Sequence, residues 1–372
     1  METILFNYRV EHYPERQSQE DTYIAGLDPL GVDGKIRHLP GLNKSRDLDA
    51  MVALLYSILP SPVQLQNFDY YEAVATMRDI GMFLGSIKRL GKEPVHLVPE
   101  LEYVLEELAA KTNMPPRDTL LHYSVWNPDG IRQRSYTGTS DEFHLIKSVK
   151  VAMHPLLRCI NQLSQLQDMD PATAAFAEKA EEVSSWFKGM IAGVVLAKRE
   201  VDPRVFATEL RFYFDPISIF GKEYLGPGAV EMPMFLYDQM LWVGAEARPS
   251  YREFQETYVP YILPHLRTLY AQTRDRDSLV EIINARLCEP GIFNPQLMRS
   301  AKALQRLLKQ LMTFRMPHKK MAESSYKHEQ AQHSKGSGGY STTILHEIMD
   351  LSMEKIKPFE VSLQQYLKRG SI

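Results

Sequence analysis

The sequence predicts an all-α fold, and three observations support this. Apolar residues recur at intervals of three and four along most of the 372 residues, which is the spacing of one helix face. Strand signals are confined to residues 213–224, which could form a small hairpin or an irregular excursion. The composition, 44% hydrophobic and 24% charged, is that of an ordinary globular protein. We therefore expect a large, buried helical core.

Two helices are expected in the first third of the chain. Residues 69–90 form the first, and residues 99–111 form the second, with a proline suited to its first turn. Residues 127–138 contain several turn formers and predict a loop. The apolar stripe of the first helix consists of Ala73, Met77, Ile80, Phe83, Leu84 and Ile87.

Longer helices are expected after this loop. Residues 139–142 have the types that begin a helix, and Pro155 should perturb the helix that follows. The loop at 127–138 is the best domain boundary, so we expect a small helical domain over 1–138 and a larger one over 139–372. Further helices are predicted over residues 170–198, 203–212, 229–243, 251–270 and 295–314.

Charge and cysteine content exclude several classes of protein. The net charge of −3 gives no electrostatic footprint for nucleic acid. The longest uncharged apolar run, between Lys188 and Lys198, is too short to cross a membrane. Cys159 and Cys288 cannot form a disulfide framework, and no signal peptide is visible, so we expect a cytoplasmic protein. The covalent heme-attachment motif Cys-x-x-Cys-His is also absent.

One histidine, His318, follows a long apolar stripe at helical spacing. Pro317 removes a backbone donor just before it and should kink the helix there. A single imidazole at the rim of an apolar cavity is a common way to hold heme iron. On spacing alone, however, a structural histidine is the commoner outcome for such a residue. The residues that lead to His318 along this face are Leu304, Leu308, Leu311 and Arg315.

A glycine-rich stretch over residues 335–340 follows His318. Its flexible backbone could approach a polar ligand closely, or it could simply cap the helix expected to follow at residues 342–353. It is neither a Walker A loop nor a dinucleotide fingerprint. His328 and His333 are one residue too far apart for a zincin motif.

Several longer segments carry a family resemblance. They are residues 39–43, 75–81, 83–86, 125–128, 134–138, 225–233 and 251–254, together with the two C-terminal segments at 314–323 and 335–340. With these segments the chain resembles the heme-dependent aromatic oxygenases, which include the tryptophan and indoleamine 2,3-dioxygenases. Within that superfamily it is most similar to the monodechloroaminopyrrolnitrin synthase family of pyrrolnitrin biosynthesis. The resemblance implies an indoleamine 2,3-dioxygenase-like helical fold.

The resemblance also implies roles for the heme site. His318 would be the proximal ligand of a noncovalent heme b. Gly228 and Ala229 match the small-residue segment over the distal face, where bulk would fill the space of dioxygen. Gly338, in the glycine-rich loop, would lie near the heme as well.

For the substrate, the resemblance implies five further residues. Phe206 would form a wall against the indole, and Arg211 would bind the carboxylate, unless its role is a structural ion pair. Tyr326 and Ser337 are candidate substrate contacts, with a packing tyrosine and a helix cap as the alternatives. His144 is a candidate proton donor, although a hydrogen-bonded structural histidine is the commoner outcome.

The activity implied by the resemblance is heme-dependent oxygenation of a small aromatic amino acid. Dioxygen would react with tryptophan or 7-chlorotryptophan, and the indole would rearrange with decarboxylation to an aminophenyl-pyrrole. Electrons would come from an external donor, since no flavin or nicotinamide site is visible. Two alternatives stay open: an oxygenase of the same fold with another product, and a heme-binding sensor or carrier without turnover.

Overall fold

The computed structural model describes residues 13–291, 293–329 and 343–370. Helices dominate this part of the chain, which confirms the all-α prediction. In order, the elements are α1 (Tyr13–Gly26), α2 (Asp33–Ile36), α3 (Leu39–Ser45), α4 (Leu48–Tyr56), α5 (Pro62–Asn67), α6 (Tyr70–Arg89), α7 (Pro94–Leu97), α8 (Glu100–Thr112), α9 (Leu120–Tyr123), η2 (Gly130–Arg132), α10 (Ser140–Leu166), α11 (Ala174–Glu200), α12 (Pro203–Val205), η3 (Phe206–Leu210), η4 (Arg211–Phe214), β1 (Ile217–Ile219), β2 (Lys222–Tyr224), η5 (Ala229–Glu231), α13 (Met234–Asp238), η6 (Gln239–Val243), α14 (Pro249–Tyr258), η7 (Val259–Tyr261), α15 (Pro264–Thr273), α16 (Leu279–Cys288), α17 (Pro295–Glu329) and α18 (Thr343–Arg369).

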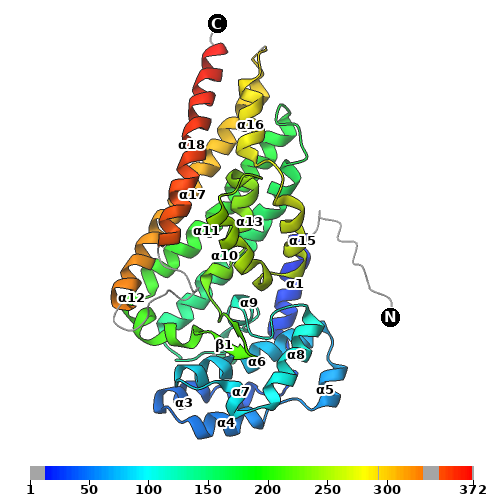
Figure 1. The fold of residues 1–372 in the computed structure, drawn as a ribbon, viewed down its shortest axis with the longest axis vertical. Helices are drawn as coiled ribbons and strands as arrows, with labels where there is room; N and C mark the ends of the chain where they lie inside the picture. Colours follow the sequence, from blue (N-terminus) through cyan, green and yellow to red (C-terminus); the bar gives the residue numbers. More distant parts are fainter. Residues whose placement is uncertain (1–12, 292, 330–342, 371–372) are drawn as a thin grey trace.

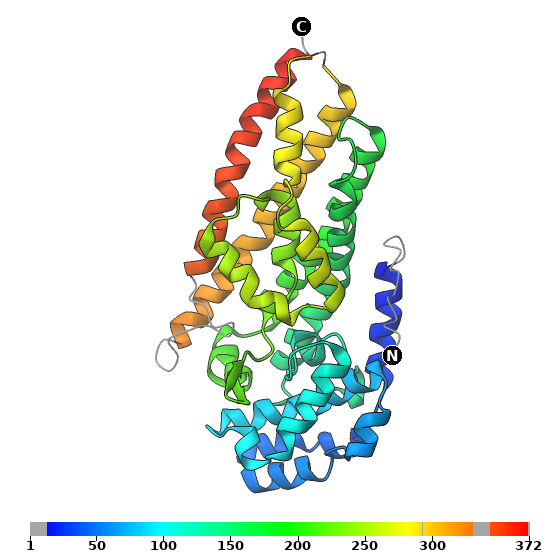
Figure 2. The ribbon, with the colours of Figure 1, turned by 45° about the vertical axis from the view of Figure 1, so that its right-hand side comes forward.

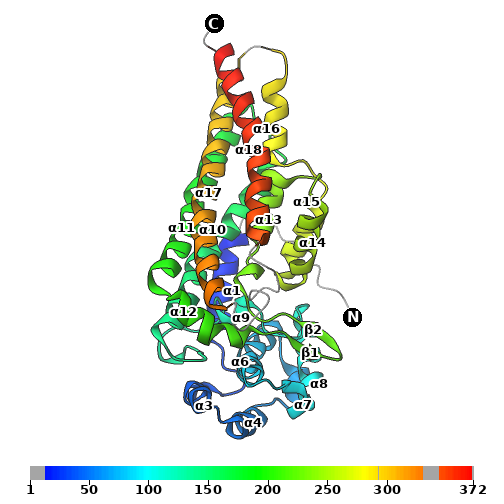
Figure 3. The same cartoon turned by 60° about the vertical axis from the view of Figure 1, so that its left-hand side comes forward.

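The molecule is elongated, with two groups of helices (Figures 1 and 2). Helices α2–α8, all short except α6, form one end, and helices α10, α11, α16, α17 and α18, all long except α16, run side by side toward the other (Figure 3). Two clusters of buried apolar side chains correspond to these groups. Residues 210–219 pack into the cluster of the short helices, although they follow residue 138 in sequence. A domain boundary at residue 138 stays a prediction.

Helix α6 is the buried centre of the short-helix group. Asp69 caps its N-terminus and forms a capping box with Glu72, so the helix begins where the sequence predicts. All six residues of the predicted stripe are buried. The other faces are buried as well, from Ala73 to Ile87, because the helix is surrounded on all sides.

The loop between the two groups is tightly fixed. The backbone N–H of Arg134 donates to the Asn127 side chain at 2.9 Å, and the Asn127 side-chain amide donates to the Arg134 carbonyl at 2.8 Å. The Arg134 guanidinium also pairs with the fully buried Asp79 of α6 at 2.8 Å. The loop predicted at 127–138 is therefore an ordered connection that is bound to the central helix.

The long helices pack closely through small residues. Thr139 caps α10, as its sequence predicts, and the helix continues through Pro155 to Leu166. Gly189 of α11 leaves room for the Pro155 ring, because a Cβ at that position would lie 2.3 Å from Cγ of Pro155. The expected perturbation at Pro155 therefore does not interrupt the helix.

Four predicted helices have different limits in the structure. Residues 229–243 are divided among the 3-10 turn η5, helix α13 and the π-turn η6. Residues 203–212 form a short α-helix, a π-turn and a 3-10 turn in succession. Residues 251–270 are divided between α14 and α15, since prolines at 260 and 264 prevent one continuous helix. Helix α17 runs through Pro317 to Glu329, well beyond the predicted end at 314. The hairpin expected within 213–224 is present as β1 and β2, joined by Phe220 and Gly221 at positive φ.

Candidate active site

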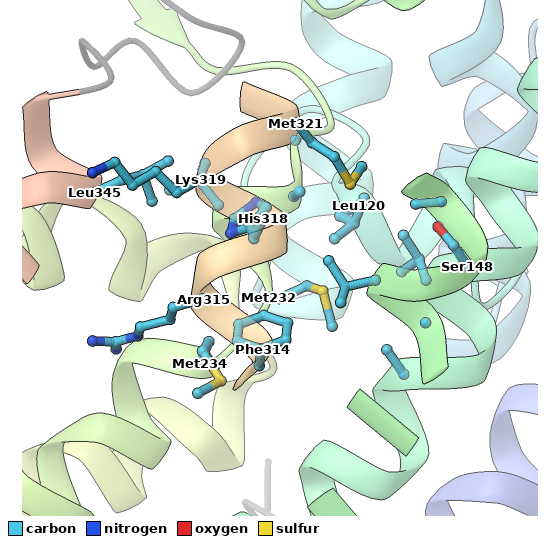
Figure 4. A pocket seen from close by; sticks show the side chains of 18 of the residues that line it. Leu120, Ser148, Met232, Met234, Phe314, Arg315, His318, Lys319, Met321 and Leu345 are labelled. Carbon is cyan, nitrogen blue, oxygen red and sulfur yellow. The ribbon is translucent and has the colours of Figure 1, made fainter. Parts of the chain in front are cut away.

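A cavity of about 370 Å³ lies among the long helices. Helices α10, α11, α14, α17 and α18 contribute to its wall, and so does the irregular segment 227–232. Most of its lining is apolar, which suits a large planar cofactor or an aromatic substrate. Figure 4 shows part of this lining, with α17 on one side and Ser148 on the other.

Helix α17 places His318 in the wall of the cavity. Phe314, one turn earlier, and Met321, nearly one turn later, line the same wall, as the helical spacing predicts. The ring centroids of Phe314 and His318 are 5.8 Å apart. Burial lowers the pKa of His318, and the positive charge of Arg315 lowers it further. The imidazole is therefore neutral at pH 7, which is the form that coordinates a metal.

A buried ion pair supports this part of α17 from behind. Arg315 extends away from Ser148 in Figure 4, and its guanidinium pairs with Asp238 of α13. Tyr251 donates to the Asp238 carboxylate at 3.1 Å, and the Trp242 indole donates to it at 2.8 Å. Arg315 also lies over the Trp242 ring at 5.5 Å. These contacts fix α17 one turn before His318.

The segment 225–232 crosses another face of the cavity. Gly228 and Ala229 both line it, together with Pro227, Val230 and Met232. The N–H of Leu225 donates to the Tyr261 hydroxyl at 2.9 Å, which anchors the start of the segment. Small side chains at 228 and 229 leave the adjoining cavity space open.

Aromatic side chains form a third face. Phe206 begins the π-turn η3 and lines the cavity, as do Phe214 and Tyr123. The rings of Tyr123 and Phe214 meet edge to face with centroids 5.1 Å apart, and Phe206 lies 6.5 Å from Phe214. This arrangement offers ring faces and edges to an aromatic ligand.

A comparison with protein families identifies the chain. The family model described as monodechloroaminopyrrolnitrin synthase PrnB matches residues 47–359, which is most of the chain. The chain belongs to this family. It is therefore an oxidoreductase of the pyrrolnitrin pathway, a heme oxygenase that acts on tryptophan derivatives. Within the described ranges, no helix is both long and apolar enough to cross a membrane.

The structure brings together four of the residues that the resemblance to the synthases singled out. Phe206, Gly228, Ala229 and His318 come from three distant parts of the chain and all line the cavity. Their individual roles stay predictions. The backbone of Tyr326 belongs to α17, but its side chain lies outside the described part of the structure. Ser337 and Gly338 lie outside the described residues altogether.

Arg211 and His144 do not line the cavity in the part of the chain that the structure describes. Arg211 is buried and pairs with Asp215, one helical turn later, at 2.8 Å. The Nδ1 atom of His144 lies 2.8 Å from the carbonyl oxygen of Ser140. In this synthase, the neighbours Leu145 and Ser148 line the cavity from α10 instead.

Several lining residues were not anticipated from the sequence. The sequence places Arg315 on the helix face that leads to His318, but it does not indicate that Arg315 pairs with Asp238. Asp238 is 77 residues away in sequence, and nothing local indicates the contact. Tyr123 is on α9, a helix of four residues that is too short for its apolar pattern to identify.

Proposed function

We propose that this synthase binds heme b noncovalently with His318 as the proximal ligand, in an indoleamine 2,3-dioxygenase-like fold. The proposed reaction converts tryptophan or 7-chlorotryptophan to an aminophenyl-pyrrole with loss of the carboxyl group. One observation carries the proposal: a neutral imidazole lies in the wall of a large apolar cavity, in a chain of the synthase family.

The residues around the cavity fit a heme group. His318 supplies a neutral nitrogen ligand, and the apolar side chains near it suit the faces of a porphyrin. Gly228 and Ala229 leave room where larger side chains would fill the cavity. When bound, the heme would supply the activation of dioxygen, while the protein supplies binding and orientation.

The remaining tasks fall to the residues of the chain itself. We assign the aromatic face of Phe206, Phe214 and Tyr123 to the indole ring, because ring contacts fix an aromatic plane. The Arg315–Asp238 pair keeps α17 in place, so the imidazole is held in one position. The apolar lining excludes water from the reacting atoms.

Five further residues stay in the proposal on the basis of resemblance alone. Arg211 is proposed to bind the substrate carboxylate, and its pairing with Asp215 is the competing structural role. Tyr326 and Ser337 are proposed substrate contacts, and Gly338 is proposed to lie near the heme. His144 is proposed as a proton donor, and the alternative is a structural role through its contact with Ser140.

Electron supply and location complete the proposal. An external donor provides electrons, and the enzyme works in the cytoplasm. The two cysteines support a reducing compartment, since Cys159 and Cys288 are both free thiols.

The experiment is a titration of the ferrous, heme-loaded protein with tryptophan and with 7-chlorotryptophan. The Soret band should shift on binding, and mass spectrometry after exposure to dioxygen should find a decarboxylated, rearranged product. A Soret shift with an oxygenated but undecarboxylated product would favour the alternative oxygenase. Heme binding without any substrate-induced shift or turnover would favour a sensor or carrier.

A further inference from the structure

The outer side of the cavity-lining segment carries a buried cluster of charged residues. Glu231 is on this segment, yet its side chain points away from the large cavity and is not among the residues that line it. It lines a second cavity of about 10 Å³ instead, otherwise walled by apolar side chains. Burying a carboxyl group in such surroundings costs free energy unless the group is hydrogen-bonded.

Glu231 connects the segment to helix α9. Its Oε2 atom accepts a hydrogen bond from the backbone N–H of Leu120 at 2.6 Å, at the first turn of α9. Its Oε1 atom accepts no hydrogen bond from the described residues. Leu120 and Tyr123 of α9 line the large cavity, and so do Ala229 and Val230 beside Glu231. One carboxyl group thus joins two walls of the cavity.

Arg117 supports the same segment from below. It is fully buried and donates to the carbonyl oxygens of Asp215 at 2.6 Å and Tyr224 at 3.2 Å. Its Nη2 atom lies only 2.6 Å from where a Cβ on Gly226 would be. Gly226 therefore lets the segment 225–232 lie directly on the guanidinium, and a larger residue there would displace it.

Helix α6 lies against Asp118, the third charged residue of the cluster. Asp118 pairs with Arg117 at 3.5 Å, and Asp118 fits against α6 because residue 81 is glycine. A Cβ at Gly81 would lie 2.3 Å from Cβ of Asp118. The motif at residues 75–81, which the heme site does not use, thus has a structural purpose: it admits the cluster that lies under the cavity.

The single positive charge of Arg117 is balanced when one of the two carboxyl groups, Asp118 or Glu231, is ionised. Burial raises the pKa of Glu231 well above its usual range, and the neighbouring Asp118 raises it further, while Leu120 and Arg117 oppose the shift. Burial also raises the pKa of Asp118, and Arg117 opposes this. Because Asp118 is the direct partner of Arg117, Glu231 is the carboxyl group that stays protonated. Tyr261 is a titratable group close to both Glu231 and Arg117, and Tyr136 is close to Arg117 and Asp118.

We propose that Glu231 and Arg117 are positioning residues for the substrate cavity, which act by fixing the segment 225–232 against α9 and α6. Glu231 acts as a neutral hydrogen-bonding group and takes no part in proton transfer to the substrate. The expected change in KM rests on the proposed heme oxygenase function. The coupling of the segment to α9 does not depend on that function.

The experiment compares Glu231→Gln with Glu231→Ala in the full chain. Glutamine keeps an uncharged acceptor for the Leu120 amide, whereas alanine removes it. We expect Glu231→Gln to keep the wild-type KM and kcat. Glu231→Ala should raise KM for tryptophan by about tenfold, the change expected if the hydrogen bond that fixes the segment is lost. Asp21→Asn, at a buried carboxyl group elsewhere that accepts from Gln17 and Trp126, is the matched control and should leave KM unchanged.

A second readout needs neither heme nor turnover. Hydrogen exchange of the heme-free protein should show faster exchange at Leu120 in Glu231→Ala and wild-type exchange in Glu231→Gln. If Glu231→Ala does not fold, Gly226→Ala tests the second anchor of the segment, since its methyl group would push the segment away from Arg117 and the Phe214 carbonyl oxygen. This variant should also raise KM.

Two results would overturn the proposal. One is a wild-type KM together with wild-type Leu120 exchange in Glu231→Ala or, where only Gly226→Ala folds, a wild-type KM in Gly226→Ala. The other is a loss of kcat at unchanged KM in Glu231→Gln, which would mean that the carboxyl group acts in the chemistry. A wild-type protein that binds no heme would contradict the proposed function alone, because the exchange experiment would still decide the positioning role.

Discussion

Replacing Asp238 by asparagine should destabilise the protein strongly, because it removes the counter-charge of Arg315 without changing the shape of the site. Both side chains are nearly inaccessible to solvent, with exposed fractions of 8% for Arg315 and 3% for Asp238. After the substitution, the partners of the guanidinium among the described residues are the Ile348 carbonyl at 3.3 Å, the Ser352 hydroxyl at 3.4 Å, the Trp242 ring and an uncharged amide oxygen at 238. None of these groups carries a negative charge.

The expected size of the effect follows from the burial of the pair. Breaking a buried ion pair by removing one partner lowers the free energy of unfolding by about 3–5 kcal/mol. For a chain of 372 residues the entropy of unfolding is about 0.8 kcal/mol per kelvin. The midpoint of thermal unfolding should therefore fall by about 4–6 °C.

Thermal unfolding of the heme-free protein, followed by circular dichroism, measures this shift. The double variant Asp238→Asn/Arg315→Met should recover most of the loss, because it removes both charges and keeps an acceptor for Tyr251 and Trp242. The exposed pair Arg248–Glu354 supplies the control, with exposed fractions of 55% and 56%. Glu354→Gln should change the free energy of unfolding by less than about 1 kcal/mol.

The reasoning fails if Asp238→Asn melts within about 1 °C of the wild type, since a buried unpaired charge cannot be that inexpensive. It also fails if the double variant melts lower than Asp238→Asn. In that case the packing of these side chains, and not their charges, would hold α17 against α13 and α18.

Two other substitutions test the substrate site and the pH dependence of stability. Arg211→Ala should weaken binding of tryptophan much more than binding of indole, by about 1.5–3 kcal/mol if the guanidinium binds the carboxylate; equal losses in the two Soret titrations would make Arg211 purely structural. Burial raises the pKa of Asp21 to about 6, from about 3.9 for an ordinary aspartate. A raised folded-state pKa gives stability that is complete below about pH 4 and is lost as the pH rises through about 6. Asp21→Asn should remove about 3 kcal/mol of this pH dependence in denaturant titrations between pH 4 and pH 7, and an unchanged dependence would mean that Asp21 is ionised in the fold.

The sequence predicted those features that local interactions determine. The start of α6 follows from the Asp69 capping box, and the start of α10 follows from the Thr139 cap. The position of His318 on the cavity wall follows from the spacing of apolar residues on α17. Each of these features depends on residues within a few turns of one another, so a local pattern contains the information.

Features that depend on distant contacts were missed. Residues 203–212 are predicted as one helix, but residues 206–214 form a π-turn and a 3-10 turn where they pack against α6 and α17. The pairing of Arg315 with Asp238 joins two helices, and neither sequence pattern specifies the partner. The ion pair of Arg211 with Asp215 is different, because it is a local contact. Its spacing of four residues in the sequence already indicated a structural role.

The central claim is that His318 holds the heme, and heme stoichiometry tests it most directly. Purified wild-type protein and His318→Ala are titrated with hemin, and bound heme is measured by pyridine hemochrome assay and by the Soret band. His96→Ala, which changes an exposed histidine on α7, is the control for loss of any imidazole. The account predicts one heme per chain for the wild type and for His96→Ala. For His318→Ala it predicts loss of tight binding or an altered Soret band, with the helical circular dichroism retained. Unchanged heme stoichiometry and spectra in His318→Ala would contradict it.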